Sequence, residues 1–116
     1  MVDLVADRGT VHVVNTRNGG AIPGVADYLV VEVAARVGHR DVTPLGVAPL
    51  RDDVAELIDA VKAAELATIV AAVRGDHDAG IEALALHPLG PTRKRSPAVW
   101  TRLVELNRGW LGRLES

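Results

Sequence analysis

A long helical pattern decides how the second half of this chain can fold. Between about residues 52 and 74, apolar side chains recur at the i, i+3 and i+4 spacing that is typical of one face of an α-helix. Pro49 precedes the stretch, and Arg74 and Gly75 follow it as the last-turn cation and the glycine that commonly end a helix. We therefore predict a helix over 52–74, and the residues that form its apolar face are Val54, Leu57, Ile58, Val61, Ile69 and Val73.

Two further helices are expected after this one. Asp76 has the side chain of a helix N-cap, and Pro88 disfavours helix at the residue before it, which predicts a second helix between them. Ser96 followed by Pro97 is a cap followed by proline at the first helical position, so a third helix should begin there. The apolar face of the second helix is formed by Ile81, Leu84 and Ala85. That of the third is formed by Val99, Leu103, Leu106, Trp110 and Leu114.

The first part of the chain is predicted to form strands. Val11–Val14 and Leu29–Val33 are rich in β-branched residues, and Val42–Val47 is a candidate for a third short strand. The second strand is apolar on both faces except at Glu32, which predicts cover on both sides. Asn18-Gly19-Gly20 favours a turn with positive φ angles. The expected fold class is α+β, with two to three short strands followed by three helices in a single domain over 1–116.

Composition excludes several classes of protein. The 116 residues contain no cysteine, which rules out disulfides, thiolate metal sites and a cysteine nucleophile, and which fits a cytoplasmic protein. The formal net charge of −2 gives no strong field to attract nucleic acid or an anionic membrane. The only aromatic residues are Tyr28, Trp100 and Trp110, so the core must be aliphatic, and the two tryptophans indicate a core seam or a docking face.

Most candidate chemical groups have a structural explanation. The four histidines, His12, His39, His77 and His87, lack the pair spacing that zinc sites use, so no metal site is predicted. The acids Asp52, Asp53, Glu56, Asp76 and Asp78 stand at helix starts, where carboxylates stabilise the helix dipole. Residues 93–95, Arg-Lys-Arg, are interpreted as a solvated loop. No Ser-His-Asp arrangement and no Gly-x-Ser-x-Gly motif is visible.

The segment after the first strand carries the strongest binding signal. Asn15, Arg17 and Asn18 offer two amides and a guanidinium, and Gly19 and Gly20 expose backbone N–H groups. Such a loop can bind an anion or a sugar hydroxyl. Spacing alone favours a plain turn, because Asn-Gly steps are common in turns. We take Asn15, Arg17 and Asn18 as candidate substrate-pocket residues, and no catalytic, cofactor-binding or metal-ligating residue is predicted.

Four motifs in register resemble glycoside hydrolase family 4, in particular its 6-phospho-β-glucosidases. They extend from about residue 9 to residue 92. They are Val13-Val14-Asn15-Thr16-Arg17-Asn18-Gly19-Gly20-Ala21-Ile22, then Asp27 with Val30-Val31-Glu32-Val33, then Val61-Lys62 with Glu65 and Thr68, and finally His87-Pro88-Leu89-Gly90-Pro91. The chain departs from the family pattern at Ala34 and Ala64, where a proline and a tyrosine are usual.

The resemblance implies an unusual chemistry and an incomplete site. Family members use NAD⁺ and a divalent metal, commonly manganese, to oxidise the sugar at C3 so that a tyrosine base can remove the C2 proton and the aglycone can leave. The parts of the family that hold these cofactors come before the region that this chain resembles. The resemblance therefore implies a C-terminal fragment without its N-terminal Rossmann domain, with the fold of the C-terminal domain of lactate and malate dehydrogenases. It would be inactive alone, and Arg17 would face the 6-phosphate of the substrate.

Partners follow from the same interpretation. A sheet built to pack on an absent domain should expose an apolar face and favour a homo-oligomer, with a sugar 6-phosphate as the substrate of the full-length enzyme. The alternatives are a non-catalytic, stand-alone binding or oligomerisation domain that docks through the helix bearing Trp100 and Trp110, and a sugar-phosphate sensor.

Overall fold

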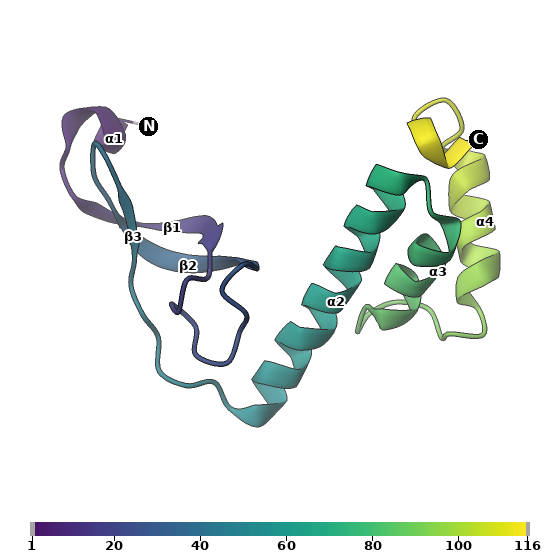
Figure 1. Cartoon of the computed structure of the whole chain (residues 1–116), viewed down its shortest axis with the longest axis horizontal. Coiled ribbons are helices and arrows are strands. Elements are labelled where there is room, and N and C mark those ends of the chain that lie inside the picture. Colours follow the sequence, from purple (N-terminus) through teal and green to yellow (C-terminus); the bar gives the residue numbers. More distant parts are fainter. Residues whose placement is uncertain (1, 116) are drawn as a thin grey trace. The chain divides into compact units, whose positions relative to one another are not determined.

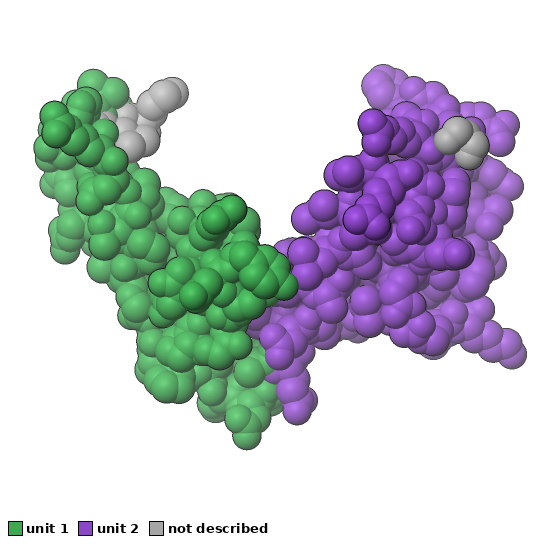
Figure 2. Space-filling model, in the orientation of Figure 1, with its two compact units in different colours: residues 1–55 green, residues 56–116 purple. Residues whose placement is uncertain are grey.

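The computed structural model describes residues 2–115, which form two compact units, 1–55 and 56–116 (Figure 2). The first unit holds three strands after a short N-terminal helix, and the second holds the helices (Figure 1). The predicted α+β class, with strands first and helices after, is confirmed. No helix within residues 2–115 combines the length and the apolar character that crossing a membrane requires.

The strands form one antiparallel sheet in the order β1-β2-β3. They are β1 (Thr10–Arg17), β2 (Val30–Val37) and β3 (Val42–Pro44), and helix α1 (Val2–Ala6), which was not predicted, precedes them. The first two strands are longer than their β-branched runs, because polar residues such as Asn15 and Arg36 still pair in the ladder. The predicted third strand ends at Pro44 instead of Val47.

One face of the sheet is buried and the other is exposed. In β2 the alternate residues Val31, Val33, Ala35 and Val37 are buried, and the residues between them are mostly exposed. The prediction of cover on both sides of this strand was therefore wrong for the described residues. The loop between β1 and β2 completes this core with Ala21, Ile22 and Val25.

Three α-helices make up the second part of the chain. They are α2 (Asp52–Arg74), α3 (His77–Leu86) and α4 (Ser96–Leu106), and a 3₁₀ turn, η1, follows at Gly112–Glu115. Helix α2 has the predicted bounds, and the side chain of Asp76 caps α3 by accepting a hydrogen bond of 2.9 Å from the backbone N–H of Ala79. Ser96 does not cap α4: it is the first helical residue, and its buried hydroxyl donates to Thr92 O.

Helices α3 and α4 pack side by side through a glycine and a tryptophan (Figure 1). A Cβ at Gly80 would lie 2.3 Å from the indole of Trp100, so only glycine lets the ring approach α3 this closely. The predicted apolar stripe of α4 is not the packed face. Leu103 and Leu106 are exposed, and Trp110, beyond the helix, is 88% exposed. Of that stripe, Leu114 is buried, in η1.

Candidate functional site

The candidate site lies at the end of β1, on the exposed face of the sheet. Strand geometry places residues 11, 13, 15 and 17 on one face, and their partners across β2 are residues 36, 34, 32 and 30. Asn15 is opposite Glu32, and Arg17 is opposite Val30, so the amide, the carboxylate and the guanidinium share one surface. All three polar side chains are exposed. The strand pairing thus places the two predicted pocket residues Asn15 and Arg17 on the same surface, and it adds Glu32 to that surface.

Asn15 and Arg17 are not engaged with the rest of the protein. Neither side chain forms a hydrogen bond or an ion pair with another residue in the described range 2–115. A guanidinium in this state can offer its planar fork to two oxygen atoms of a carboxylate or a phosphate. The surface is therefore suited to binding an anion and not to acid–base chemistry.

Asn18 has a different position, inside the loop that follows β1. Only 1% of it is exposed. Its Nδ2 donates to Ile22 O at 3.1 Å and to Val25 O at 2.7 Å, and its Oδ1 accepts from Ile22 N at 2.7 Å. Gly19 and Gly20 beside it have φ angles of 48° and 86°, so the predicted turn with positive φ is confirmed. The amide of Asn18 is thus occupied in folding the loop, and it positions the loop beside Arg17.

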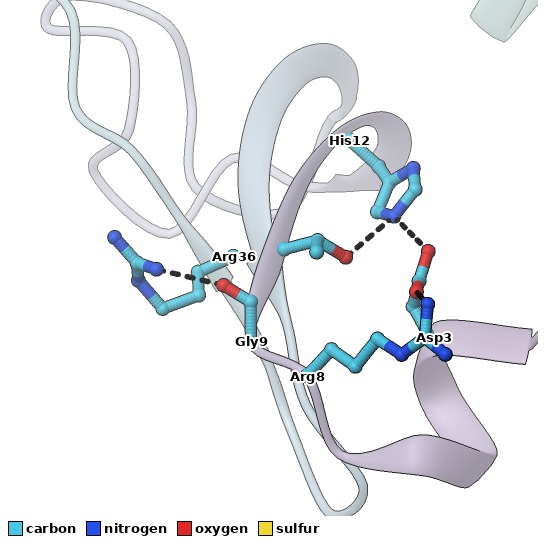
Figure 3. A network of polar contacts seen from close by, with 6 residues as sticks. Asp3, Arg8, Gly9, His12 and Arg36 are labelled. Carbon is cyan, nitrogen blue, oxygen red and sulfur yellow. Dashed lines mark hydrogen bonds and ion pairs between the residues drawn. The ribbon is translucent and has the colours of Figure 1, made fainter.

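The structure also forms a polar network that the sequence did not reveal. Nε2 of His12 lies 2.9 Å from Oδ2 of Asp3 and 2.9 Å from Oγ1 of Thr10, and Arg8 pairs with Asp3 at 3.8 Å (Figure 3). An Asp-His-Thr group resembles the parts of a nucleophilic triad. In a triad, however, the acid and the hydroxyl use opposite ring nitrogens, so that a proton can pass through the imidazole. Here both use Nε2, so the network attaches α1 to β1 and does not activate the hydroxyl.

The basic segment at residues 93–95 is partly engaged. Arg93 donates to both carboxylate oxygens of Glu82 on α3. The hydrogen bond from Arg93 lowers the pKa of Glu82, and the same contact raises the pKa of Arg93. Lys94 and Arg95 are exposed, as expected of a solvated loop.

The cavities of the helical unit are mainly apolar. One, of about 640 Å³, is bordered by small residues including Ala64, Ala71 and Ala83, and by Trp100. Thr68 at its edge donates its hydroxyl to Ala64 O, and His87 accepts from the backbone N–H of Leu89. These polar atoms already have partners in the chain, so the cavity offers no evident chemistry.

The residues present do not fit a resident metal or a dinucleotide. Within residues 2–115, no three His, Asp or Glu side chains come together as a metal site would need. The four histidines have separate surroundings, including Asp3 for His12 and Trp100 for His77. The chain also lacks the Gly-x-Gly-x-x-Gly turn between a strand and a helix that holds a pyrophosphate.

Comparison with known proteins identifies one family. Residues 1–90 match the family model described as the family 4 glycosyl hydrolase C-terminal domain. The 6-phospho-beta-glucosidase BglT of Thermotoga maritima is 33% identical over 109 residues, which is 94% of this chain and 26% of that protein. A probable 6-phospho-beta-glucosidase of Bacillus subtilis is 29% identical over 105 residues, 90% of this chain and 24% of that protein. The chain thus spans about a quarter of the length of these curated relatives.

Solved structures agree with this result. The 6-phospho-beta glucosidase of Thermotoga maritima, solved with manganese, NAD+ and glucose-6-phosphate, superposes with a TM-score of 0.86 at 33% identity, over 94% of this chain and 27% of that one. A 6-phospho-alpha-glucosidase from gut microorganisms, solved with NAD and glucose-6-phosphate, has a TM-score of 0.88 at 24% identity, over 94% of this chain and 25% of that one, which shows the fold alone. This chain therefore belongs to the family 4 glycosyl hydrolases and has the fold of their C-terminal domain.

Proposed function

We propose that this chain is the C-terminal part of a 6-phospho-β-glucosidase, in which it forms a wall of the sugar-phosphate pocket. NAD and a divalent metal would be held by other parts of the enzyme, since the residues described here do not fit either group. When bound, these cofactors supply the oxidation and the charge stabilisation that the reaction needs. The observation that carries the proposal is the unpaired Arg17, beside Asn15, on the exposed face of the sheet of a chain from this family.

Arg17 is the residue proposed to bind the 6-phosphate. A phosphate dianion and a guanidinium can form two parallel hydrogen bonds, which give both energy and orientation. No carboxylate of the described chain competes for Arg17 by an ion pair. Glu32 lies diagonally across the strand pair from Arg17, where it can accept a hydrogen bond from a sugar hydroxyl.

The two asparagines are proposed to act differently. Asn15 is exposed, and its amide can both donate to and accept from sugar hydroxyls. Asn18 is buried and holds the loop, so it acts as a positioning residue and does not touch the sugar. Both would serve the pocket, one by contact and one through the backbone of residues 19–25.

The other end of the same sheet face is proposed to pack against the cofactor-binding part of the enzyme. Val13 is 69% exposed, and Val11 is also exposed. Burying the exposed part of each valine would contribute up to about 1.5 kcal/mol. A face that is apolar at Val11 and polar at Arg17 would place the substrate at the border between the two parts. We also propose that the enzyme is a homo-oligomer, because further apolar surface is exposed on the helices.

A chimeric enzyme tests the proposed function. The matched 109 residues would replace the corresponding segment of the Thermotoga maritima enzyme, and hydrolysis of a nitrophenyl β-glucoside 6-phosphate would be measured with NAD and Mn²⁺. We expect activity, and we expect Arg17→Ala to raise KM by about tenfold or more, because one charged hydrogen-bonding partner is worth about 1.5–3 kcal/mol. Arg17→Lys, which keeps the charge but loses the fork, should give an intermediate KM.

The matched control is Arg108→Ala, which removes an exposed arginine from the helical unit and should leave KM unchanged. NAD binding and a cooperative melt would show that each chimera is folded. A folded chimera that binds NAD but hydrolyses nothing would refute the proposal. It would favour the alternative of a non-catalytic binding or oligomerisation domain.

A further inference from the structure

The apolar cavity of the helical unit has the size of a small-molecule site. Its volume is about 640 Å³, and such sites commonly measure about 300–1,000 Å³. Its walls come from α2 (residues 64–72), from α3 and the loop after it (80–91), from Trp100 of α4, and from residues 111–114. We call this space the helical cavity. All of its walls belong to one compact unit, and their composition decides which class of ligand fits.

Two walls of the helical cavity are made of very small residues. Ala64 and Ala71 of α2 are buried, and so are Gly80 and Ala83 of α3. Side chains this short leave an apolar surface without bulky projections. A flat, rigid apolar molecule fits such walls best, because dispersion attraction requires many atoms at contact distance.

Trp100 supplies an aromatic wall that is in place before any ligand binds. Its Nε1 donates to Nδ1 of His77 at 3.0 Å, and its six-membered ring lies against Gly80, where a Cβ would be only 2.3 Å away. Aromatic rings attract one another beyond the effect of burial alone. A wall that is already ordered also avoids the entropy cost of ordering it on binding. The wall therefore favours an aromatic ligand.

The segment after α4 forms a further wall with Leu111 and Leu114. Leu114 is buried, and Arg113 beside it donates through Nη1 to Val73 O, near the end of α2, at 2.5 Å. This wall is therefore attached to α2 by a contact between distant parts of the sequence. It lies beyond residues 1–90, so the complete cavity is not part of the matched family domain.

The charge of the walls favours an uncharged ligand. Among the described residues that border the helical cavity, Glu65 has the only formal charge, and its Oε2 is paired with Nζ of Lys62 at 2.7 Å. An ionic ligand would lose its hydration here without gaining a free opposite charge, and burying a charge in this way is costly.

Two polar side chains of the lining each have one hydrogen-bonding position left over within residues 2–115. Nδ1 of His87 accepts the N–H of Leu89 at 3.1 Å, so a neutral His87 carries its proton on Nε2 and can donate it. Thr68 donates its hydroxyl proton to Ala64 O at 2.8 Å, so its oxygen can still accept. A hydroxyl group on a ligand can accept from His87 or donate to Thr68.

We propose that the helical cavity binds an uncharged aromatic alcohol of one or two rings, a molecule of the phenol or naphthol class. The small walls and Trp100 hold the rings, and His87 and Thr68 bind the hydroxyl group. The proposal concerns the helical unit alone and does not depend on the proposed sugar-phosphate site.

The test titrates the full, isotope-labelled chain with 2-naphthol and follows the two indole N–H resonances by NMR. We expect saturable binding with a dissociation constant between about 10 μM and 1 mM, which is ordinary for an uncharged ligand of about eleven non-hydrogen atoms. The Trp100 resonance should shift, and that of Trp110, whose side chain is 88% exposed, should not. The anion 2-naphthoate, which has the same rings, should bind at least about tenfold more weakly.

Substitutions in the walls test the location. Ala72 borders the cavity and is exposed, so Ala72→Phe can place a ring in the cavity without displacing the core, and it should abolish the Trp100 shift. Leu111→Trp is a second filling variant, which keeps the test decisive if one of the two does not fold. Ala98→Phe is the matched control, because this exposed alanine of α4 does not border the cavity, and it should bind 2-naphthol normally.

The hydroxyl contacts are tested by Thr68→Val combined with His87→Ala, which should weaken binding of 2-naphthol by about three- to tenfold. Cooperative melting shows which variants are folded. The proposal is overturned if saturable binding is absent up to about 2 mM, if 2-naphthoate binds equally well, or if Trp110 shifts as much as Trp100. It is also overturned if folded filling variants still bind. A Trp100 resonance that moves with protein concentration alone would show that a second copy fills the cavity, and this too would overturn it.

Discussion

The indole Nε1 of Trp100 donates a hydrogen bond of 3.0 Å to Nδ1 of His77, which links the middle of α4 to the first turn of α3. The two rings meet edge to face, with their centroids 6.0 Å apart. The hydrogen bond satisfies the indole N–H of Trp100, whose ring is half-buried. It also orients the indole across Gly80, where the ring leaves no room for a Cβ.

Removing this hydrogen bond should reduce the stability of the helical unit. Trp100→Phe and His77→Ala should each lower the free energy of unfolding, and their double-mutant cycle should give a coupling of about 0.5–1.5 kcal/mol. Urea unfolding followed by circular dichroism provides the measurement. A cycle with Trp110→Phe in place of Trp100→Phe serves as the control, and its coupling to His77 should be zero, because Trp110 is almost fully exposed.

Gly80→Ala should destabilise the chain, although alanine is the better helix former. Without a clash, the change would favour a helix by about 1 kcal/mol. The new Cβ would lie 2.3 Å from the Trp100 ring, and such overpacking costs about 1–3 kcal/mol, so the ring must move. Gly46→Ala is the matched control, since its Cβ would have its nearest neighbour at 4.0 Å. If Gly80→Ala raised the melting temperature, the close packing of α3 and α4 would be disproved.

Two asparagines three residues apart, Asn15 in β1 and Asn18 in the loop after it, should differ in how much their truncation costs. Asn18→Ala leaves Ile22 N–H and two carbonyls without their partner and should cost about 3 kcal/mol. Asn15→Ala removes an exposed side chain and should change stability by less than about 0.5 kcal/mol. Chemical denaturation of both variants checks this, and hydrogen exchange should show faster exchange at residues 19–25 only for Asn18→Ala. Equal losses in the two variants would contradict the buried position of Asn18.

The Glu82–Arg93 pair predicts a pH dependence with a definite sign. Because the hydrogen bond from Arg93 lowers the pKa of Glu82 below its ordinary value of 4.5, the folded chain binds this proton less readily than the unfolded chain. The pair therefore stabilises the fold above that ordinary value, and the contribution is lost as the pH falls through the lowered pKa. Melting curves of the unmodified chain and Glu82→Gln should differ slightly at pH 7 and converge in acid. Glu105→Gln is the control, because it removes a weaker ion pair. A difference between the melting curves that widens in acid would contradict the effect of Arg93 on Glu82.

Local signals explain what could be predicted of the fold. The bounds of α2 follow from Pro49 and Gly75, and the start of α3 follows from the Asp76 cap, because capping and backbone conformation depend on neighbours within a few residues. The positive φ angles at Gly19 and Gly20 follow for the same reason. Ser96 also has the side chain of a cap, but it is the first helical residue, and its hydroxyl donates to Thr92 O.

Sequence periodicity could not tell which apolar face of a helix is packed. The large residues Ile69 and Val73 belong to the predicted apolar face of α2, yet they are exposed. The small residues Ala64 and Ala71 are buried instead. Small side chains let helices approach closely, and the pattern of large residues then stays available for another partner. In the same way, the sequence made Asn15 and Asn18 equal candidates for the pocket. Asn18 is buried because the loop after β1 folds around it.

The sequence by itself determined the order of the strands and the three long helices, the bounds of α2, the turn at Gly19 and Gly20, and the family motifs around Asn15–Ile22, because these depend on short-range geometry and residue identity. Only the tertiary structure decided that Arg17 is unpaired on an exposed sheet face and that Asn18 is buried. It also decided that His12 contacts Asp3 and Thr10 through one ring nitrogen, and that Trp100 is packed while Trp110 is exposed. Those outcomes depend on which surfaces meet across long sequence distances, and burial is a property of the meeting surfaces and not of either residue alone.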